Sequence, residues 1–365
     1  MRVVFFVGTL EAGGLERFVT RVCREAKARH LFDPVVVCLH KRTGVFLDEL
    51  NREGIPVHAA PGRWYRSAKD WMGLVRVLRT TKAELVHSQV NFSLIQQFLA
   101  ARLAGMSYLV TERNCYRRTG FALYRRRIQY YFLKTFGVQY SANSRRVADH
   151  LAEMLKEPVE KFPIFPNGIT IESGDVRLDS RLKSRSCVTV AYIARMARHK
   201  GHMFFLEVLE KLVYQRGIDL KGVLIGDGPM RPAIERAVQE KKLSNFVQFT
   251  GIISNVEDRI REVDIVALFS DYEGMSNVVI EAMAVAKPVV ATDTGNAREL
   301  LESGAGLILD RKEANRAVEL IESLILSPSK REEMGRMGQT IIKEQFSLSA
   351  ILVRMVQNYH KFLRG

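Results

Sequence analysis

Residues 264–284 read DIVALFSDYEGMSNVVIEAMA. The run Asp264–Ser270 is short, apolar and typical of a buried strand, and the residues after Ser276 have the composition of a helix. The stretch therefore predicts a strand, a polar loop and a helix. Backbone amides from Met275 to Val278 would open that helix, and their partial positive charge suits a bound phosphate.

Two carboxylates flank the start of this helix. Glu273 precedes it and Glu281 lies inside it, roughly 10 Å further along by helix rise. One small ion could hardly contact both, whereas a nucleotide sugar has hydroxyl groups at both ends and phosphates between them. Acidic residues at a helix start can also be simple caps or partners of the helix dipole, and that alternative stays open.

The same strand and helix alternation recurs along the chain, which predicts an α/β fold with two doubly wound domains. The strands expected in the first half are Val3–Val7, Pro34–Leu39, Leu85–Ser88, Tyr108–Thr111 and Val138–Ala142. The strands expected in the second half are Val188–Ile193, Gly222–Ile225, Val247–Phe249, Ile265–Phe269 and Pro288–Ala291. We expect domains at 1–169 and 187–347, a linker at 170–186 and a closing helix at 348–365.

Composition narrows the class of protein. A chain of 365 residues with 47% apolar content can bury two cores. Its four cysteines are scattered without paired spacing, so we expect neither disulfides nor a zinc site, which fits a reducing cytosol. No uninterrupted apolar run of spanning length occurs, and Met1–Val7 reads as a first strand rather than a secretion signal.

Positive charge is concentrated in the first half. Residues 1–165 hold 27 Lys and Arg against 14 Asp and Glu, whereas residues 166–365 hold 28 against 26. This asymmetry indicates that the first half meets an anionic surface. Nucleic acid would leave the motifs of the second half unused, so we expect none as a partner.

A membrane surface is the anionic partner that the sequence favours. Basic residues alternate with aromatic residues from Arg113 to Phe136, a pattern that suits an interfacial helix on anionic lipid. The alternative is a helix with aromatic residues in the core and arginines in water. Candidate residues for the acceptor or the membrane are Trp64, Tyr65, Arg113, Asn114, Arg125, Arg126 and Arg127.

Two further loops follow expected strands. Gly13 and Gly14 stand between the first strand and its helix, where glycines let the backbone approach a ligand. Arg195 and Lys200 stand in the loop after Val188–Ile193. Each of these is also compatible with an ordinary turn or a solvated surface cation.

Together these motifs resemble the family-4 retaining glycosyltransferases, whose GT-B fold has two Rossmann-like domains facing a central cleft. In that family the first Glu of a Glu-(seven residues)-Glu signature faces the donor sugar and the second holds the ribose. The resemblance implies those roles for Glu273 and Glu281. It implies diphosphate binding by the intervening amides of Gly274, Met275, Ser276, Asn277 and Val278.

The resemblance extends to the other loops. It implies that Arg195 and Lys200 contact the donor diphosphate, with Glu273 as the third catalytic residue. Donor-binding roles also follow for Gly13, Gly14, Gly228 and Ile252. One departure stands out, because many relatives carry a His where this chain reads Thr111-Glu112-Arg113-Asn114. In such a fold His87, near the end of the expected strand Leu85–Ser88, would lie close to this loop. We expect its side chain to be packed or hydrogen-bonded.

The resemblance implies a retaining, metal-independent glycosyltransferase that needs no cofactor. We expect a nucleotide-sugar donor, linked to UDP, and a saccharide or lipid-linked glycan acceptor in polysaccharide or lipopolysaccharide synthesis. The expected location is cytoplasmic, peripheral at the inner face of the membrane. Two alternatives remain: a nucleotide-sugar epimerase of the same fold, and a non-catalytic basic protein that binds membranes or nucleic acid.

Overall fold

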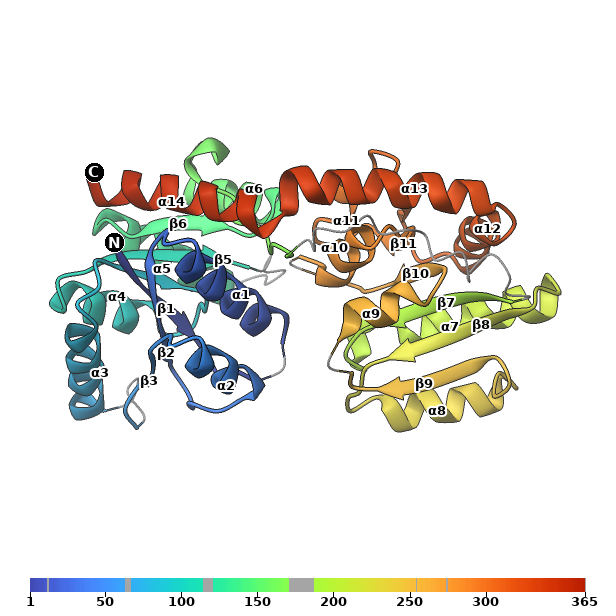
Figure 1. Ribbon diagram of the computed structural model, residues 1–365, viewed down its shortest axis with the longest axis horizontal. Coiled ribbons are helices and arrows are strands. Elements are labelled where there is room, and N and C mark those ends of the chain that lie inside the picture. Colours follow the sequence, from blue (N-terminus) through green and yellow to red (C-terminus); the bar gives the residue numbers. More distant parts are fainter. Residues whose placement is uncertain are drawn as a thin grey trace. The chain divides into compact units, whose positions relative to one another are not determined.

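The computed structural model describes residues 1–11, 13–62, 67–113, 121–170, 187–253, 255–273 and 275–364. Contacts divide the chain into two compact units. The first unit combines Met1–Thr170 with Ser347–Gly365, and the second is Ile171–Phe346. Figure 1 shows that each unit is a sheet with helices on both faces.

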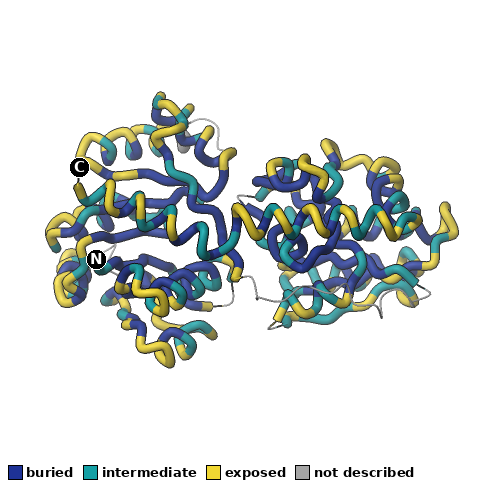
Figure 2. The backbone as a smooth tube through the Cα atoms, turned by 45° about the horizontal axis from the view of Figure 1, so that its top comes forward, coloured by how far each residue is buried: buried dark blue, intermediate teal, exposed yellow. Residues whose placement is uncertain are grey.

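The sheet of the first unit has six parallel strands in the order β3-β2-β1-β4-β5-β6. The strands are β1 (Arg2–Val7), β2 (Asp33–Cys38), β3 (Val57–Ala59), β4 (Leu85–Ser88), β5 (Ser107–Glu112) and β6 (Gln139–Ala142). Val3–Val7 is fully buried, as expected for a central strand that is covered on both faces. Figure 2 shows this buried interior in each unit.

Seven helices cover the described part of this sheet. They are α1 (Gly14–Ala28), α2 (Val45–Arg52), α3 (Ala68–Thr81), α4 (Leu94–Leu103), α5 (Phe121–Thr135), α6 (Arg145–Leu155) and the last helix, α14 (Leu348–Arg364). The last helix packs against α1 through Ile351, Met355 and Tyr359, in one apolar core with Phe18 and Val22. The end of the chain is therefore part of the first unit.

The second unit has six strands in the order β12-β11-β10-β7-β8-β9, again all parallel. They are β7 (Val188–Ile193), β8 (Leu220–Ile225), β9 (Val247–Gly251), β10 (Ile265–Leu268), β11 (Val289–Thr292) and β12 (Gly306–Leu309). The helices are α7 (His202–Glu210), α8 (Arg231–Glu240), α9 (Val256–Arg261), α10 (Asn277–Ala284), α11 (Ala297–Leu301), α12 (Ala314–Ile325) and α13 (Pro328–Ile341).

Each sheet has one point at which the direction of winding reverses. In the first unit this point lies between β1 and β4, and in the second between β7 and β10. The loops that follow such strand pairs separate at the carboxyl edge of the sheet, and ligands of doubly wound proteins bind in that crevice. The expectation of two doubly wound α/β domains is confirmed, and a ligand of either unit is expected at the switch point of its sheet.

Candidate active site in the second unit

The loop after β10 places Glu273 beside Lys200, which comes from the loop after β7. Lys200 Nζ lies 2.6 Å from Glu273 Oε1, and Ser270 Oγ donates to the same oxygen at 2.7 Å. The Glu273 side chain is only 13% exposed and that of Lys200 only 22%. Two residues that are 73 positions apart thus meet at the switch point of this sheet.

Hydrogen bonds to backbone groups hold these two loops together. Tyr192, at the end of β7, donates its hydroxyl proton to Lys200 O and accepts a hydrogen bond from Phe269 N at 2.9 Å. Asp271 N donates to His199 O at 2.8 Å. Burial raises the pKa of the Tyr192 phenol, so it remains a donor at neutral pH.

Gly201 follows Lys200 and allows the loops to approach closely. Its φ of +73° is left-handed, and a Cβ there would lie 2.0 Å from Phe269 O. Only glycine fits this conformation and this separation. Arg195, on the same loop, is exposed and therefore available to a ligand.

The start of α10 is the expected phosphate site. Its N-cap residue, Ser276, forms no side-chain capping bond, whereas Ser276 N donates to Asn296 Oδ1 at 3.1 Å. This contact orients the Asn296 amide, because Oδ1 is committed to Ser276 and Nδ2 then points elsewhere. Asn296 is 2% exposed, and its Nδ2 has no hydrogen-bond partner among the described residues.

Asn296 was not predicted from the sequence. It follows β11, which lies next to β10, so the end of β11 reaches the same edge of the sheet. The tetrapeptide Asp293-Thr294-Gly295-Asn296 directly after a strand was the available signal. Thr294 Oγ1 in this loop is likewise buried without a hydrogen-bond partner in the described chain.

The other predicted donor residues of this unit lie on neighbouring loops. Glu281 is 6% exposed within α10, close after Asn277 and Val278, which are half-buried. Gly228 follows β8, and a Cβ there would lie 2.5 Å from Met196 O in the loop that carries Arg195. Ile252 follows β9 and is 77% exposed. Gly274 lies outside the described residues.

In the first unit, Gly13 is the N-cap of α1 and Gly14 is the first residue of that helix. The side chain of Glu16 folds back over this start, since a Cβ on Gly13 would lie 2.2 Å from Glu16 Oε2. Burial raises the pKa of the Glu16 carboxyl, and attraction to Arg113 opposes that rise. The helix start and Arg113 therefore belong to one electrostatic environment.

Arg126, a candidate residue for the acceptor or the membrane, points inward. Its side chain is 14% exposed, and Nη2 lies 3.4 Å from the buried carboxylate of Glu112 and 3.1 Å from Tyr130 Oη. Arg126 therefore neutralises a core carboxylate and is not part of an exposed membrane face. Arg125 is exposed on α5, and Arg127 is half-buried. Trp64, Tyr65 and Asn114 lie outside the described residues.

His87 confirms the expectation of a packed, hydrogen-bonded residue. It is fully buried, with Nδ1 2.6 Å from Tyr359 Oη and Nε2 2.6 Å from Thr111 Oγ1. Burial lowers the pKa of this imidazole well below its ordinary value. Both ring nitrogens of His87 are therefore engaged by side chains within the first unit.

Two family profiles match the chain. Residues 12–173 match "Glycosyltransferase Family 4", and residues 181–340 match "Glycosyl transferases group 1". The chain belongs to glycosyltransferase family 4. The resemblance drawn from the sequence motifs is therefore confirmed.

Individual relatives of the chain are also named as glycosyltransferases. The chain is 31% identical over 164 residues to alpha-D-kanosaminyltransferase of Streptomyces kanamyceticus, a match of 44% of this chain and 42% of that one. It is 26% identical over 181 residues to the capsular polysaccharide biosynthesis glycosyltransferase CapM of Staphylococcus aureus, covering 48% and 46%. The matches thus span less than half the length of these two curated relatives.

The fold is GT-B. HepE of Anabaena, solved in complex with UDP and glucose, superposes with a TM-score of 0.82 at 20% identity, over 99% of this chain and 99% of that one. At this level of identity the likeness shows the fold alone, and UDP and glucose are ligands of HepE.

Proposed function

We propose that this family-4 protein transfers a sugar from a UDP-linked donor to a glycan acceptor during the synthesis of a cell-envelope polysaccharide or lipopolysaccharide. The observation that carries the proposal is the meeting of Lys200 and Glu273 beside the start of α10, at the switch point of the second sheet. A cation, a carboxylate and a helix start at one sheet edge suit a ligand that has a diphosphate and a sugar.

The donors for a diphosphate come from several loops. Lys200 and Arg195 supply positive charge, and Asn296 Nδ2 supplies a buried N–H group that lacks an acceptor in the described chain. Glu281, buried within α10, would hold the ribose hydroxyls, and Glu273 would face the sugar. Negative charge grows on the diphosphate as the bond to the sugar breaks, so these groups stabilise the transition state more than the ground state.

We propose retention of the anomeric configuration and no requirement for a metal. Arg195 and Lys200, both in the loop after β7, neutralise the departing diphosphate without a metal ion. The leaving phosphate accepts the proton of the acceptor hydroxyl on the same face of the sugar. This route needs no separate base, which suits a chain with Arg113 where many relatives have a histidine.

The class of acceptor is supported by the names of relatives. CapM is named for capsular polysaccharide synthesis. LpsE of Rhizobium meliloti, named for lipopolysaccharide core synthesis, is 27% identical over 163 residues, covering 44% of this chain and 46% of that one. These names favour an envelope glycan as the acceptor.

A thermal-shift panel of UDP-, GDP- and ADP-sugars tests the donor. We expect a UDP-sugar to raise the melting temperature most, and no shift with any of them would favour a non-catalytic binding protein. Product analysis with donor alone then tests the epimerase alternative, because an epimerase converts donor without an acceptor. NMR of the glycosidic linkage in the product reports retention or inversion directly.

We also propose that α5 contacts an anionic bilayer. Five large apolar side chains are about half exposed or more on this helix and just after it: Tyr124, Ile128, Tyr131, Phe132 and Phe136. They recur at spacings of three or four residues and share a face with the exposed Arg125 nearby. No helix among the described residues has the length and apolarity to cross a bilayer.

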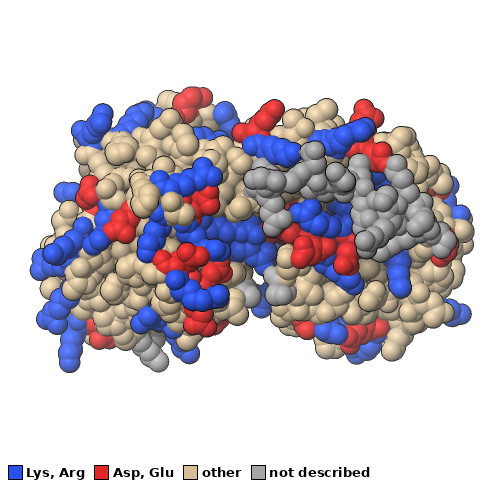
Figure 3. All heavy atoms as spheres, in the orientation of Figure 1, with Lys and Arg blue, Asp and Glu red and all other residues tan. Residues whose placement is uncertain are grey.

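Flotation with vesicles tests this surface. We expect the protein to float with vesicles that contain anionic lipid and to be released as salt increases, because the attraction is partly electrostatic. Neutral vesicles of the same size serve as the control. Absence of flotation at low salt, or a dimer formed through the same face, would overturn the proposal. Figure 3 shows Lys and Arg side chains spread over the visible face of the first unit.

A further inference from the structure

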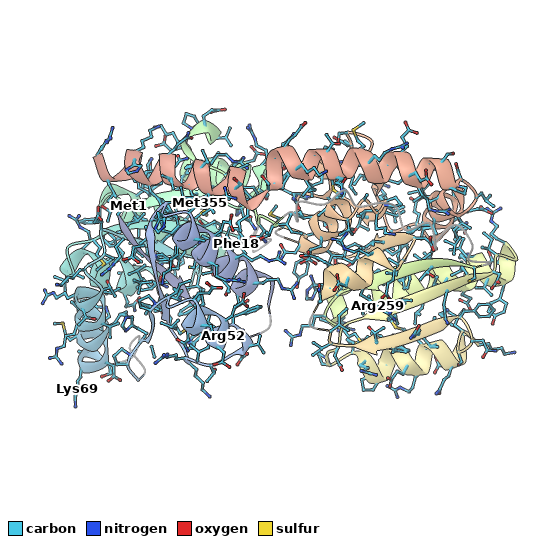
Figure 4. All side chains as sticks on the ribbon, viewed as in Figure 1. Met1, Phe18, Arg52, Lys69, Arg259 and Met355 are labelled. Atoms are coloured by element: carbon cyan, nitrogen blue, oxygen red, sulfur yellow. The ribbon has the colours of Figure 1, made fainter. Side chains whose placement is uncertain are left out.

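Arg113 occupies a built polar site at the carboxyl edge of the first sheet. It follows β5 directly, and its Nε and Nη2 donate to Gln89 Oε1, with the Nε bond at 3.0 Å. Its Nη1 donates to Asn167 Oδ1 at 2.7 Å. The guanidinium carbon lies 5.1 Å from the centre of the Phe18 ring, which α1 contributes (Figure 4).

The partners of Arg113 are neutral. Both hydrogen-bond acceptors are amide oxygens, and no carboxylate among the described residues lies within ion-pair distance of the guanidinium. Burial lowers the pKa of Arg113 to about 10, against weaker attraction from Glu16 and Glu112. A largely buried cation without a directly paired carboxylate is costly, which indicates that the charge of Arg113 serves a ligand.

Arg126 provides the contrast within the same unit. It lies beside the buried carboxylate of Glu112, so its charge is neutralised by the fold. Arg113 uses three of its five N–H groups on Gln89 and Asn167, which leaves one on each terminal nitrogen without a partner in the described chain. Two such groups on a planar guanidinium match the oxygens of a carboxylate or a phosphate.

A buried hydrogen-bond chain fixes the position of Arg113. Gln89 Nε2 lies 2.9 Å from His87 Nε2, and His87 Nδ1 lies 2.6 Å from Tyr359 Oη on α14. Because Gln89 accepts from Arg113 through its oxygen, its amide nitrogen must donate to His87, and the neutral imidazole carries its proton on Nδ1. The last helix thereby holds Gln89, and Gln89 holds the guanidinium, before any ligand arrives.

The location of Arg113 points to a substrate. The site lies by the loops after β4 and β5 and near the start of α1, at the switch point between β1 and β4. The diphosphate of the donor already has its own cations in the second unit, on Arg195 and Lys200. The substrate without an assigned anion site is the acceptor.

We propose that Arg113 binds an anionic group, a carboxylate or a phosphate, on the sugar acceptor. This inference rests on the proposed transferase function and adds that the acceptor is acidic at the group that enters this site. Gln89, His87 and Tyr359 are positioning residues that hold the guanidinium for it.

Ligand-observed NMR titrations test the proposal with three probes: methyl β-glucuronide, glucose 1-phosphate and the neutral methyl β-glucoside. We expect the wild-type protein to bind at least one anionic probe ten-fold or more tightly than the glucoside. Arg113→Gln should remove this preference and leave UDP affinity within two-fold. Arg76→Gln, at an exposed arginine on α3, is the matched control and should bind like wild type.

Arg113→Lys guards against a folding defect in the first variant. It keeps the charge without the planar fork, so it should retain a weaker preference for the anionic probes. A wild-type protein without the preference, or a folded Arg113→Gln variant that keeps it, would overturn the proposal. Loss of UDP affinity in Arg113→Gln would assign Arg113 to the donor and overturn it too. Failure of the wild-type protein to bind any nucleotide sugar would instead contradict the transferase function.

Discussion

Lys200 Nζ lies 2.6 Å from Glu273 Oε1, and this ion pair joins the loops after β7 and β10. Both side chains are largely buried, so removal of either would leave the other as an uncompensated charge. Ser270 Oγ donates to the same carboxylate oxygen and restrains Glu273 further. The pair is therefore held in place by the fold, and a donor diphosphate would approach a lysine that is already oriented.

Lys200→Ala and Glu273→Ala test this arrangement. We expect both variants to fold and to lose transfer by about 100-fold or more, the usual cost of removing one well-placed group that stabilises the transition state. The measurement is the rate of donor-dependent product formation. Lys241→Ala is the control. Lys241 Nζ lies 2.5 Å from Glu210 Oε2 in a similar ion pair, and neither residue belongs to these loops. Full turnover by either folded site variant would remove the assignment.

Glu281→Gln should act differently, on binding rather than on turnover. Glu281 is buried in α10, behind the segment that we assign to the diphosphate. If it holds the ribose, its loss weakens the ground state and the transition state alike, which raises KM with little change in kcat. Calorimetric titration with UDP measures the affinity directly. Glu240→Gln, at an exposed position at the end of α8, should leave that affinity unchanged.

The sequence predicted the central strands and missed two edge strands. β3 has only three residues, of which Ala59 is exposed, and β12 starts with a glycine and is mostly half-buried. Neither has the long apolar run that marks a strand covered on both faces. Their place in the sheets comes from pairing with β2 and β11, which is a tertiary contact.

The sites show the same limit. Glu273 and Lys200 could be placed together from topology, because both follow strands that neighbour each other. Asn296 was missed, since an asparagine in a turn after a strand is a weak signal with no distinctive spacing. The sequence does not distinguish the three consecutive arginines at 125–127 from one another. Arg126 faces inward because it pairs with the buried carboxylate of Glu112, which is a tertiary contact.

This difference among three consecutive arginines gives a prediction. Arg126→Gln should destabilise the protein by about 3 kcal/mol, because it removes the charged half of an ion pair whose carboxylate, on Glu112, is buried. Arg125→Gln removes an exposed charge and should change stability by less than about 0.5 kcal/mol. Urea unfolding measures both. Flotation should show the opposite order, with Arg125→Gln weakening vesicle binding, and equal stability of the two variants would contradict the inward position of Arg126.

The free energy of unfolding should decrease as the pH is lowered below neutral, because of His87. Burial lowers the pKa of His87 in the folded protein well below 6.5, so the unfolded chain binds a proton that the folded chain cannot. The contribution is complete above about pH 6.5 and is lost as pH falls, by about 1.4 kcal/mol for each pH unit below that value. Urea unfolding at pH 7.5 and 5.5 measures the loss, which His87→Gln should reduce.

Two comparisons isolate His87 in that experiment. His202 is also buried, and its pKa falls to about 4, so it adds a loss of the same sign in every variant that retains it. His360 lies exposed on α14, and His360→Gln serves as the matched substitution of a surface histidine. An identical pH dependence in wild type and His87→Gln would show that the imidazole is not held neutral in the folded protein.

Gly201 and Gly217 separate backbone strain from close packing. Both have left-handed φ angles, +73° and +66°, so alanine at either position costs about 1 kcal/mol or more from conformation alone. Nothing lies within 4 Å of a Cβ at Gly217, whereas a Cβ at Gly201 would collide with Phe269 O at 2.0 Å. That oxygen belongs to the backbone at the end of β10, so it cannot rotate away.

Gly201→Ala should therefore cost at least about 2 kcal/mol more than Gly217→Ala in urea unfolding. It should also push the loop after β7 away from β10 and separate Lys200 from Glu273, so UDP affinity should fall in Gly201→Ala under conditions where it is folded. Gly217→Ala should bind UDP like wild type. Equal destabilisation and equal UDP affinity in the two variants would mean that the loops do not meet as closely as the fold requires, and the Lys200 and Glu273 pair would lose its structural basis.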